Sequence, residues 1–140
     1  MSIFETIPAK PRKPRIPSEH EDQVALIQWF DLQYPALRGR LAACPNGGQR
    51  NAVVAAKLKG EGVRAGYPDL NLLTPRHGFA GLFIELKREK GGSLQSDQAD
   101  WLDWLNEQGF MAVVCKGFEA AKETITNYLA ATENYRGVSA

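Results

Sequence analysis

The chain has 140 residues, of which 44% are hydrophobic, and this length and composition predict one globular domain with an ordinary core. Seventeen lysines and arginines oppose sixteen aspartates and glutamates, so the net charge of +1 excludes a uniformly basic protein and requires any anion-binding surface to be local. The amino terminus lacks the apolar region of a signal peptide, and no stretch approaches the roughly 20 apolar residues that span a bilayer, so we expect a cytoplasmic protein with no membrane partner. Cys44 and Cys115 lack the spacing of a zinc site, so we expect both to be free thiols.

Residues 1–17 are rich in proline and in basic side chains, a composition that predicts a flexible arm. Its basic side chains either contact phosphates or belong to a solvated tail. Ser18 is typical of a helix N-cap, and the acidic residues that follow it favour the positive end of a helix. Apolar residues then supply one face, so we predict a helix over residues 19–34.

The next segment is a short apolar run, residues 40–44, which predicts a strand that ends in the loop of residues 45–48. That loop is either a plain turn or a surface of backbone amides near phosphate. Residues 51–60 have helical spacing and precede Gly60 and Gly62, which predicts a short helix. The basic residues around this helix form a cluster that the global charge conceals: Arg50, Lys57, Lys59 and Arg64.

Two strands, residues 70–73 and 79–87, are predicted to form a hairpin around a turn at residues 76–78. Side chains alternate along a strand, so Glu85 and Lys87 should share one face with Phe83. The remaining predicted elements are a helix over 96–108 that Ser96 caps, a strand over 110–115, a helix over 118–130 and a frayed tail over 132–140. This order predicts an α/β domain over residues 18–131, with a mixed central sheet flanked by helices.

Two charged side chains lie where the pattern predicts an apolar strand, and a third lies in the turn before the hairpin's first strand. Asp69 follows Pro68 at a turn, and Glu85 and Lys87 lie within the apolar run of the hairpin's second strand. Buried charges cost free energy unless a metal or a partner compensates them, although a half-exposed strand with surface ion pairs would also explain them. Phosphodiester hydrolysis needs an activated water and neutralised phosphate charge, which Mg²⁺ held by carboxylates can supply.

These residues have the chemical groups that such a site requires. Asp69 and Glu85 supply carboxylates, and the backbone carbonyl of Leu86, between the two faces, could be a third ligand. Lys87 could position or deprotonate the attacking water, or neutralise developing charge. The pattern therefore predicts a metal-dependent nuclease site.

Several segments in order resemble the VRR-NUC domains of the PD-(D/E)xK nuclease superfamily, in the stand-alone form found in phages and bacteria. The resemblance covers residues 18–129, and the matching features are Glu19 with Gln23, the 45–48 loop with Arg50, the run 58–66, Pro68-Asp69-Leu70, the run 81–87, Leu94 with Gln98, and Trp101. It implies a restriction-endonuclease-like core and a bacterial cytoplasm. The family's usual Ser-Pro before the glutamine is replaced here by Gln95-Ser96.

The resemblance also implies roles for particular residues. Asp69 and Glu85 match the metal-binding acids, Lys87 the catalytic lysine, and Gln98 a glutamine beside the site. Glu19 matches an acid from the first helix, with Glu21 as a rival. The implied cofactor is Mg²⁺, for which Mn²⁺ would substitute, with no small-molecule cofactor. The residues that we expect to bind DNA are Asn46, Arg50, Lys57 and Arg64.

The implied partner is branched DNA, and stand-alone members are similar to dimeric Holliday-junction resolvases. A twofold dimer has a physical motive, because resolving a junction requires two symmetric cuts. Trp101, Trp104 and Tyr128 are candidates for the core or for such an interface, with the core favoured for Trp101. The alternatives are a flap or duplex nuclease of repair or restriction type, a junction-binding module that does not cleave, and a protein-interaction subunit.

Overall fold

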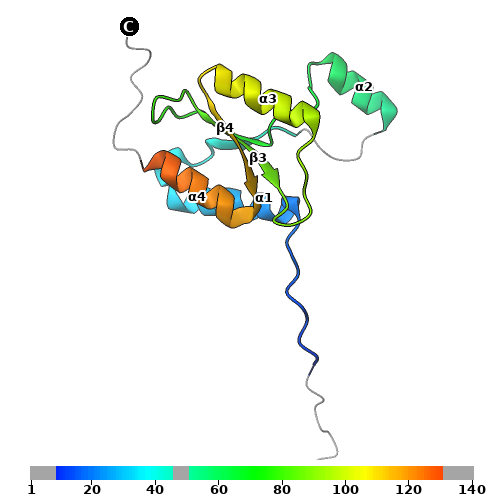
Figure 1. Cartoon of the computed structure of the whole chain (residues 1–140), viewed down its shortest axis with the longest axis vertical. Helices are drawn as coiled ribbons and strands as arrows, with labels where there is room; N and C mark the ends of the chain where they lie inside the picture. Colours follow the sequence, from blue (N-terminus) through cyan, green and yellow to red (C-terminus); the bar gives the residue numbers. More distant parts are fainter. Residues whose placement is uncertain (1–8, 46–50, 131–140) are drawn as a thin grey trace, which may run out of the picture.

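The fold is seen in a computed structural model that describes residues 9–45 and 51–130. Some predictions lie outside these residues: the DNA-binding candidates Asn46 and Arg50, most of the 45–48 loop, the first half of the arm and the tail over 132–140. Residues 9–17 form neither helix nor strand and run away from the body (Figure 1). Within the described ranges, no helix is long and apolar enough to cross a membrane.

The centre of the domain is a mixed sheet of four strands in the order β1-β2-β3-β4. The strands are β1 (Leu41–Ala43), β2 (Leu70–Leu72), β3 (Leu82–Lys87) and β4 (Met111–Lys116). The first three pair antiparallel, and β3 pairs parallel with β4. A parallel pair needs a crossover connection, which a helix between β3 and β4 provides. The predicted α/β fold with a mixed sheet is therefore confirmed.

Helices cover both faces of this sheet (Figure 1). The helices are α1 (Glu19–Gln33), α2 (Ala52–Gly60), α3 (Ser96–Glu107) and α4 (Gly117–Leu129), with a 3₁₀ turn, η1 (Pro35–Leu37). Leu82, Ile84 and Leu86 pack on the side of α1 and α4, whereas Phe83 packs with Leu102 and Leu105 of α3. Because side chains alternate along a strand, Glu85 and Lys87 belong to the α3 side, as the sequence pattern predicted.

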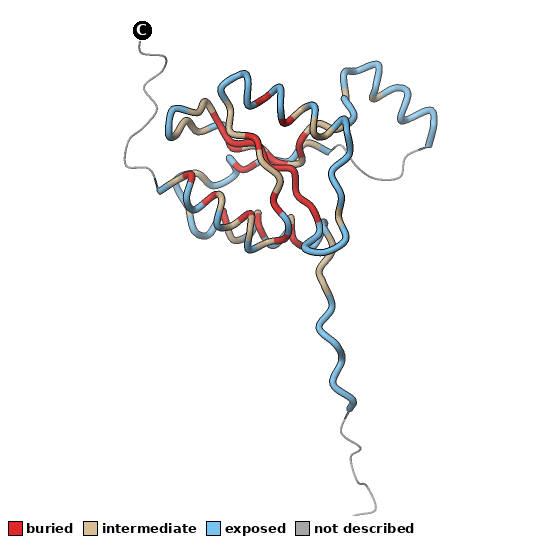
Figure 2. The backbone as a smooth tube through the Cα atoms, viewed as in Figure 1, coloured by how far each residue is buried: buried red, intermediate tan, exposed pale blue. Residues whose placement is uncertain are grey.

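All six residues of β3 are buried (Figure 2), so the alternative of a half-exposed strand is wrong. The physical reason is that a strand with a parallel neighbour and helices on both faces has no solvated side. Only 3% of Glu85 and 7% of Lys87 is exposed. Two ionisable side chains are thus held in the interior, where an uncompensated charge is costly.

The hairpin's second strand begins later than predicted. Residues 76–79 form the turn instead, through a bridge between Arg76 and Phe79, and His77 adopts a positive φ of 53°. Gln95 rather than Ser96 is the N-cap of α3. β4 begins at Met111 rather than Phe110, because the N–H of Phe110 still bonds to Leu105 at the end of α3.

The aromatic candidates divide between core and surface. Tyr128 is 2% exposed and donates its hydroxyl to the Thr74 carbonyl at 2.6 Å, so it belongs to the core. Trp101 is partly buried against the cluster under α3, as expected, whereas Trp104 is 50% exposed. Both thiols are free, with Cys115 buried and Cys44 half-buried.

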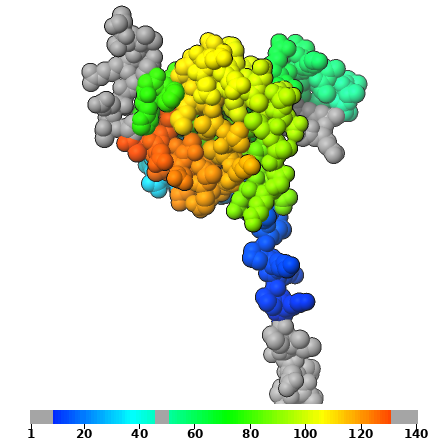
Figure 3. Space-filling model, in the orientation of Figure 1, coloured from blue at the N-terminus to red at the C-terminus, as the bar shows by residue number. Residues whose placement is uncertain are grey.

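Helix α2 forms as predicted, and it projects at one edge of the molecule (Figures 1 and 3). None of its nine residues is buried, and Val53 is 80% exposed. Asn51 caps it by accepting the N–H of Val54 at 2.8 Å. The basic side chains Lys57 and Lys59 lie in its last turn.

Candidate active site

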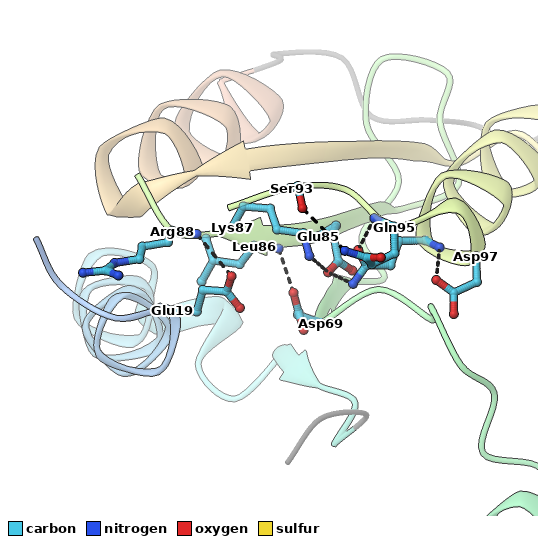
Figure 4. Close-up of polar contacts among 10 residues, drawn as sticks. Glu19, Asp69, Glu85, Leu86, Lys87, Arg88, Ser93, Gln95 and Asp97 are labelled. Carbon is cyan, nitrogen blue, oxygen red and sulfur yellow. Dashed lines mark hydrogen bonds and ion pairs between the residues drawn. The ribbon is translucent and has the colours of Figure 1, made fainter. Parts of the chain in front are cut away.

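Asp69 lies at the point where the sheet opens. β2 pairs with β3 only from Leu82 to Ile84, so the edge of residues 85–87 that faces β2 has no strand partner there. The Asp69 carboxylate occupies that position and accepts the N–H of Leu86 through Oδ2 at 2.8 Å (Figure 4). The Asp69 carbonyl in turn accepts the N–H of Cys44 at 2.9 Å. Backbone contacts therefore fix both the main chain and the side chain of this acid.

Glu85 is the buried centre of the site. Its Oε1 accepts an N–H from Gln98 Nε2 at 2.9 Å and lies 3.4 Å from Lys87 Nζ. Its Oε2 is buried and has no hydrogen-bond donor within the part of the chain that the structure describes. One oxygen of this carboxylate is thus compensated and the other is not.

The electrostatics of the acid pair reflect this burial. Burial, and then the neighbouring Asp69 carboxylate, raise the pKa of Glu85 to about 7, against the opposing effect of Lys87. The pKa of Asp69 is also raised, mainly by burial, although the Leu86 N–H acts in the opposite direction. Two carboxylates that face each other in a low dielectric need a shared proton or a cation.

The first helix contributes Glu19. Its Oε1 accepts the N–H of Arg88 at 3.3 Å, and its charge is close enough to raise the pKa of Asp69 (Figure 4). Glu21 instead forms a bidentate pair with Arg15, at 2.8 and 2.9 Å, at an exposed position. Of the two rivals, the structure thus places Glu19 beside the site.

Gln98 enters from the first turn of α3. Its Oε1 accepts the N–H of Gln95 at 2.9 Å, while its Nε2 donates to Glu85. The amide orientation is therefore fixed at both ends. Two residues that were predicted to bind DNA, Lys57 and Arg64, are exposed, and Lys57 lies on the outlying helix α2.

The donor set fits a hard divalent cation with few protein ligands. Among the described residues, no group of three or more His, Cys, Asp or Glu side chains could hold a metal by itself. Asp69 and Glu85 supply two carboxylates, and the unpaired Glu85 Oε2 is a free acceptor. The Leu86 carbonyl leaves the strand on the same side as the N–H that Asp69 accepts. Mg²⁺ keeps several waters and is commonly bound by one or two carboxylates, so this set is sufficient.

Asp22 is a buried carboxylate that the sequence analysis did not single out. It is 5% exposed, and its Oδ2 has no partner among the residues described. Burial, and then Glu89, raise its pKa, while the N–H of Phe118 at the start of α4 acts in the opposite direction. The signal was available, because Asp22, Leu26 and Phe30 are spaced four apart and form the buried stripe of α1.

Comparisons with known proteins agree with this geometry. The family model of the VRR-NUC domain matches residues 14–119. A solved structure described as a VRR_NUC domain protein is 29% identical and superposes with a TM-score of 0.74, covering 84% of this chain and 93% of that one. A comparison with curated proteins gives no match.

Proposed function

The chain belongs to the VRR-NUC domain family, and from that premise we propose that it is a metal-dependent endonuclease that hydrolyses phosphodiester bonds in branched DNA, in the manner of a Holliday-junction resolvase. The observation that carries the proposal is the carboxylate pair of half-buried Asp69 and buried Glu85 beside Lys87. The unpaired Oε2 of Glu85 and the raised pKa of this carboxyl group are expected of a site that is complete only with a cation.

Asp69, Glu85 and the Leu86 carbonyl would hold Mg²⁺, or Mn²⁺ in its place. Glu19 from α1 is a further candidate, which would have to move closer to join the two acids as a ligand. The chemistry that the bound cation supplies is polarisation of the scissile phosphate and activation of a water at neutral pH. Asp69 is aligned for this task by the Leu86 N–H, and its carboxylate also interacts with that of Glu85. Gln98 holds Glu85 Oε1 and so directs the unpaired Oε2 away from α3.

Lys87 is proposed to handle the attacking water. Its Nζ carries three N–H donors, and the contact with Glu85 Oε1 at 3.4 Å occupies one of them. Within the described residues the other two have no hydrogen bond, so they can orient the water or neutralise charge that develops on the phosphate. Burial strengthens these interactions because little solvent screens them.

We further propose that the active form is a twofold homodimer, because two symmetric cuts resolve a four-way junction. The test is a panel of labelled four-way junction, flap and plain duplex, each incubated with Mg²⁺, with Mn²⁺ and with EDTA. The oligomeric state is measured in the same buffer by light scattering. We expect metal-dependent cleavage that is fastest for the junction, by a dimer.

The other outcomes of this panel identify the alternatives. Preferred cleavage of the flap or of the duplex would replace the junction by that substrate. Binding of the junction without cleavage under either metal would indicate a non-cleaving module. No affinity for DNA at low salt would leave a protein-interaction subunit.

The exposed cations Lys57 and Arg64 are proposed to contact phosphates. Replacing both by Ala should weaken junction binding and reduce the slope of log affinity against log salt by about two, since each lost phosphate contact removes about 0.9. The measurement is fluorescence anisotropy with Ca²⁺ at several salt concentrations.

The matched control for this pair carries the same loss of charge elsewhere. The control is the double variant Arg38→Ala and Lys122→Ala, whose side chains lie in another part of the domain. Arg38 follows η1, and Lys122 Nζ lies over the Trp29 ring on the α1 and α4 side of the sheet. A control that lowers the slope as much as the test pair would contradict the assignment.

A further inference from the structure

The backbone of Gly66 lies directly against the first turn of α3. A Cβ at this position would lie 2.5 Å from the carbonyl carbon of Asp97, 2.6 Å from its oxygen and 2.8 Å from the Gln98 nitrogen. All three are backbone atoms of a helix, which cannot move aside as a flexible side chain does. Gly66 also has a φ of +82°, a conformation that side chains disfavour.

The segment that begins at Gly66 leads straight into the site. Tyr67 packs edge-to-face on Trp101 of α3, with ring centroids 5.0 Å apart. Pro68 and Asp69 follow, and the Asp69 carboxylate is bound to Leu86 of β3. One short segment therefore touches both α3 and β3, the two elements that carry Gln98 and Glu85.

Gln98 depends on where α3 begins. Because its Oε1 is bound to the Gln95 N–H, its Nε2 has to point away from the cap, where it donates to Glu85. Gln95 and Gln98 both lie at the start of α3, so a displacement of the first turn moves them together and takes Nε2 away from Glu85. The close approach at Gly66 is what limits that displacement on one side.

We propose that Gly66 is a positioning residue of the active site, whose bare backbone seats the first turn of α3 so that Gln98 donates to Glu85. The effect on catalysis rests on the proposed nuclease function, whereas the seating of Gln98 does not.

Gly62 provides a matched control in the same segment. Its φ is +99°, but a Cβ there would meet nothing within 4 Å. Gly62→Ala therefore introduces the same kind of backbone strain as Gly66→Ala without the collision with α3. Any difference between the two variants reports the contact rather than the strain.

The first experiment needs neither metal nor DNA. The side-chain amide resonance of Gln98 is assigned in a ¹H–¹⁵N spectrum by its loss in Gln98→Ala. We expect Gly66→Ala to shift this resonance and to remove its protection from exchange, while Gly62→Ala leaves both unchanged. An unshifted Gln98 resonance in folded Gly66→Ala overturns the proposal.

The second experiment measures cleavage of the junction under single turnover. Gly66→Ala should lower the rate roughly tenfold to a hundredfold, as expected when a catalytic group is displaced by a fraction of an ångström to an ångström. In a Gln98→Ala background the same change should add little, because the two residues act through one contact. Full additivity would show that Gly66 acts by another route.

A second variant keeps the test available should Gly66→Ala fail to fold. Gln95 has a φ of −80°, which proline accepts, so Gln95→Pro deletes the N–H that holds Gln98 Oε1. We expect it to shift the Gln98 resonance in the same way, and an unchanged resonance would contradict the mechanism. If the unmodified protein cleaves no substrate, the proposed function fails, yet the resonance experiments still decide the seating of Gln98.

Discussion

Replacing Asp69 by Asn is expected to abolish cleavage and, at the same time, to stabilise the metal-free protein. The Asn amide oxygen can still accept the Leu86 N–H, so the local structure is kept. The change removes one of two neighbouring carboxylates, half-buried Asp69 beside buried Glu85, which lowers the pKa of Glu85 towards its ordinary value. Loss of one charged ligand should reduce the rate more than about 10³-fold, corresponding to several kcal/mol of lost stabilisation by the metal.

The gain in stability has the same origin as the loss of activity. Burial raises the pKa of Asp69, so its ionised form is disfavoured in the folded state at pH 8. We expect the free energy of unfolding in EDTA to rise, because burial penalises the Asp69 carboxylate and does not penalise the uncharged Asn amide in the same way. Urea denaturation in EDTA and single-turnover cleavage in Mg²⁺ measure the two effects.

Asp31 supplies the control for this variant. It also accepts a backbone N–H, from Gly39 at 3.0 Å, but it lies near the end of α1. Asp31→Asn should leave cleavage and its metal dependence unchanged. Retention of full activity in Asp69→Asn would overturn the assignment of Asp69 as a metal ligand.

The centre of the site could be predicted because it violates the pattern around it. Glu85 and Lys87 interrupt an apolar run, and the period of two places them on one face with Phe83. The structure bears out that shared face and adds burial on both sides. A charge in a buried strand is informative because folding alone gives no reason for it.

The choice between Glu19 and Glu21 could not be made from sequence. Both lie in the first turn of one helix, where either carboxylate favours the dipole. The two carboxylates differ in their partners: Arg15 pairs with Glu21, whereas the N–H of Arg88, which is distant in sequence, donates to Glu19.

Gly66 and α2 show two further limits of pattern reasoning. A glycine before Pro68-Asp69 indicates a turn, and nothing local reveals that Asp97 lies 2.5 Å from its missing Cβ. Periodicity predicted α2, but it also implies that the apolar residues are buried, and Val53 is 80% exposed. The contact at Gly66 and the exposure of α2 both depend on how segments that are distant in sequence pack in the folded chain.

Metal affinity is expected to rise about a hundredfold between pH 5 and pH 8. In the metal-free protein the pKa of Glu85 is about 7, so below that value a cation must displace a proton, and each pH unit then changes the apparent affinity about tenfold. Above the pKa the curve should flatten. The raised pKa of Asp69 makes the dependence steeper at the acidic end.

Because metal binding and proton binding compete at Glu85, stability should depend on pH in opposite directions in the metal-free and the metal-bound protein. Without metal, the folded pKa of Glu85 lies above its ordinary value of 4.5, so its contribution is fully present below 4.5 and is lost as the pH rises through 7. With metal, the ionised form is favoured, and stability is gained over that range. The difference in Tm with and without Mn²⁺ should therefore widen from pH 5 to pH 8.

Calorimetry in two buffers of different ionisation enthalpy should detect release of about one proton per metal bound near pH 6. Glu85→Gln is the control, because its side chain does not titrate and cannot supply the charged ligand. It should lose most of the metal-induced rise in Tm at every pH. A rise in Tm that is the same at pH 5 and pH 8 would mean that the cation does not bind at Glu85, because binding there displaces the proton that this carboxyl group holds below its pKa of about 7.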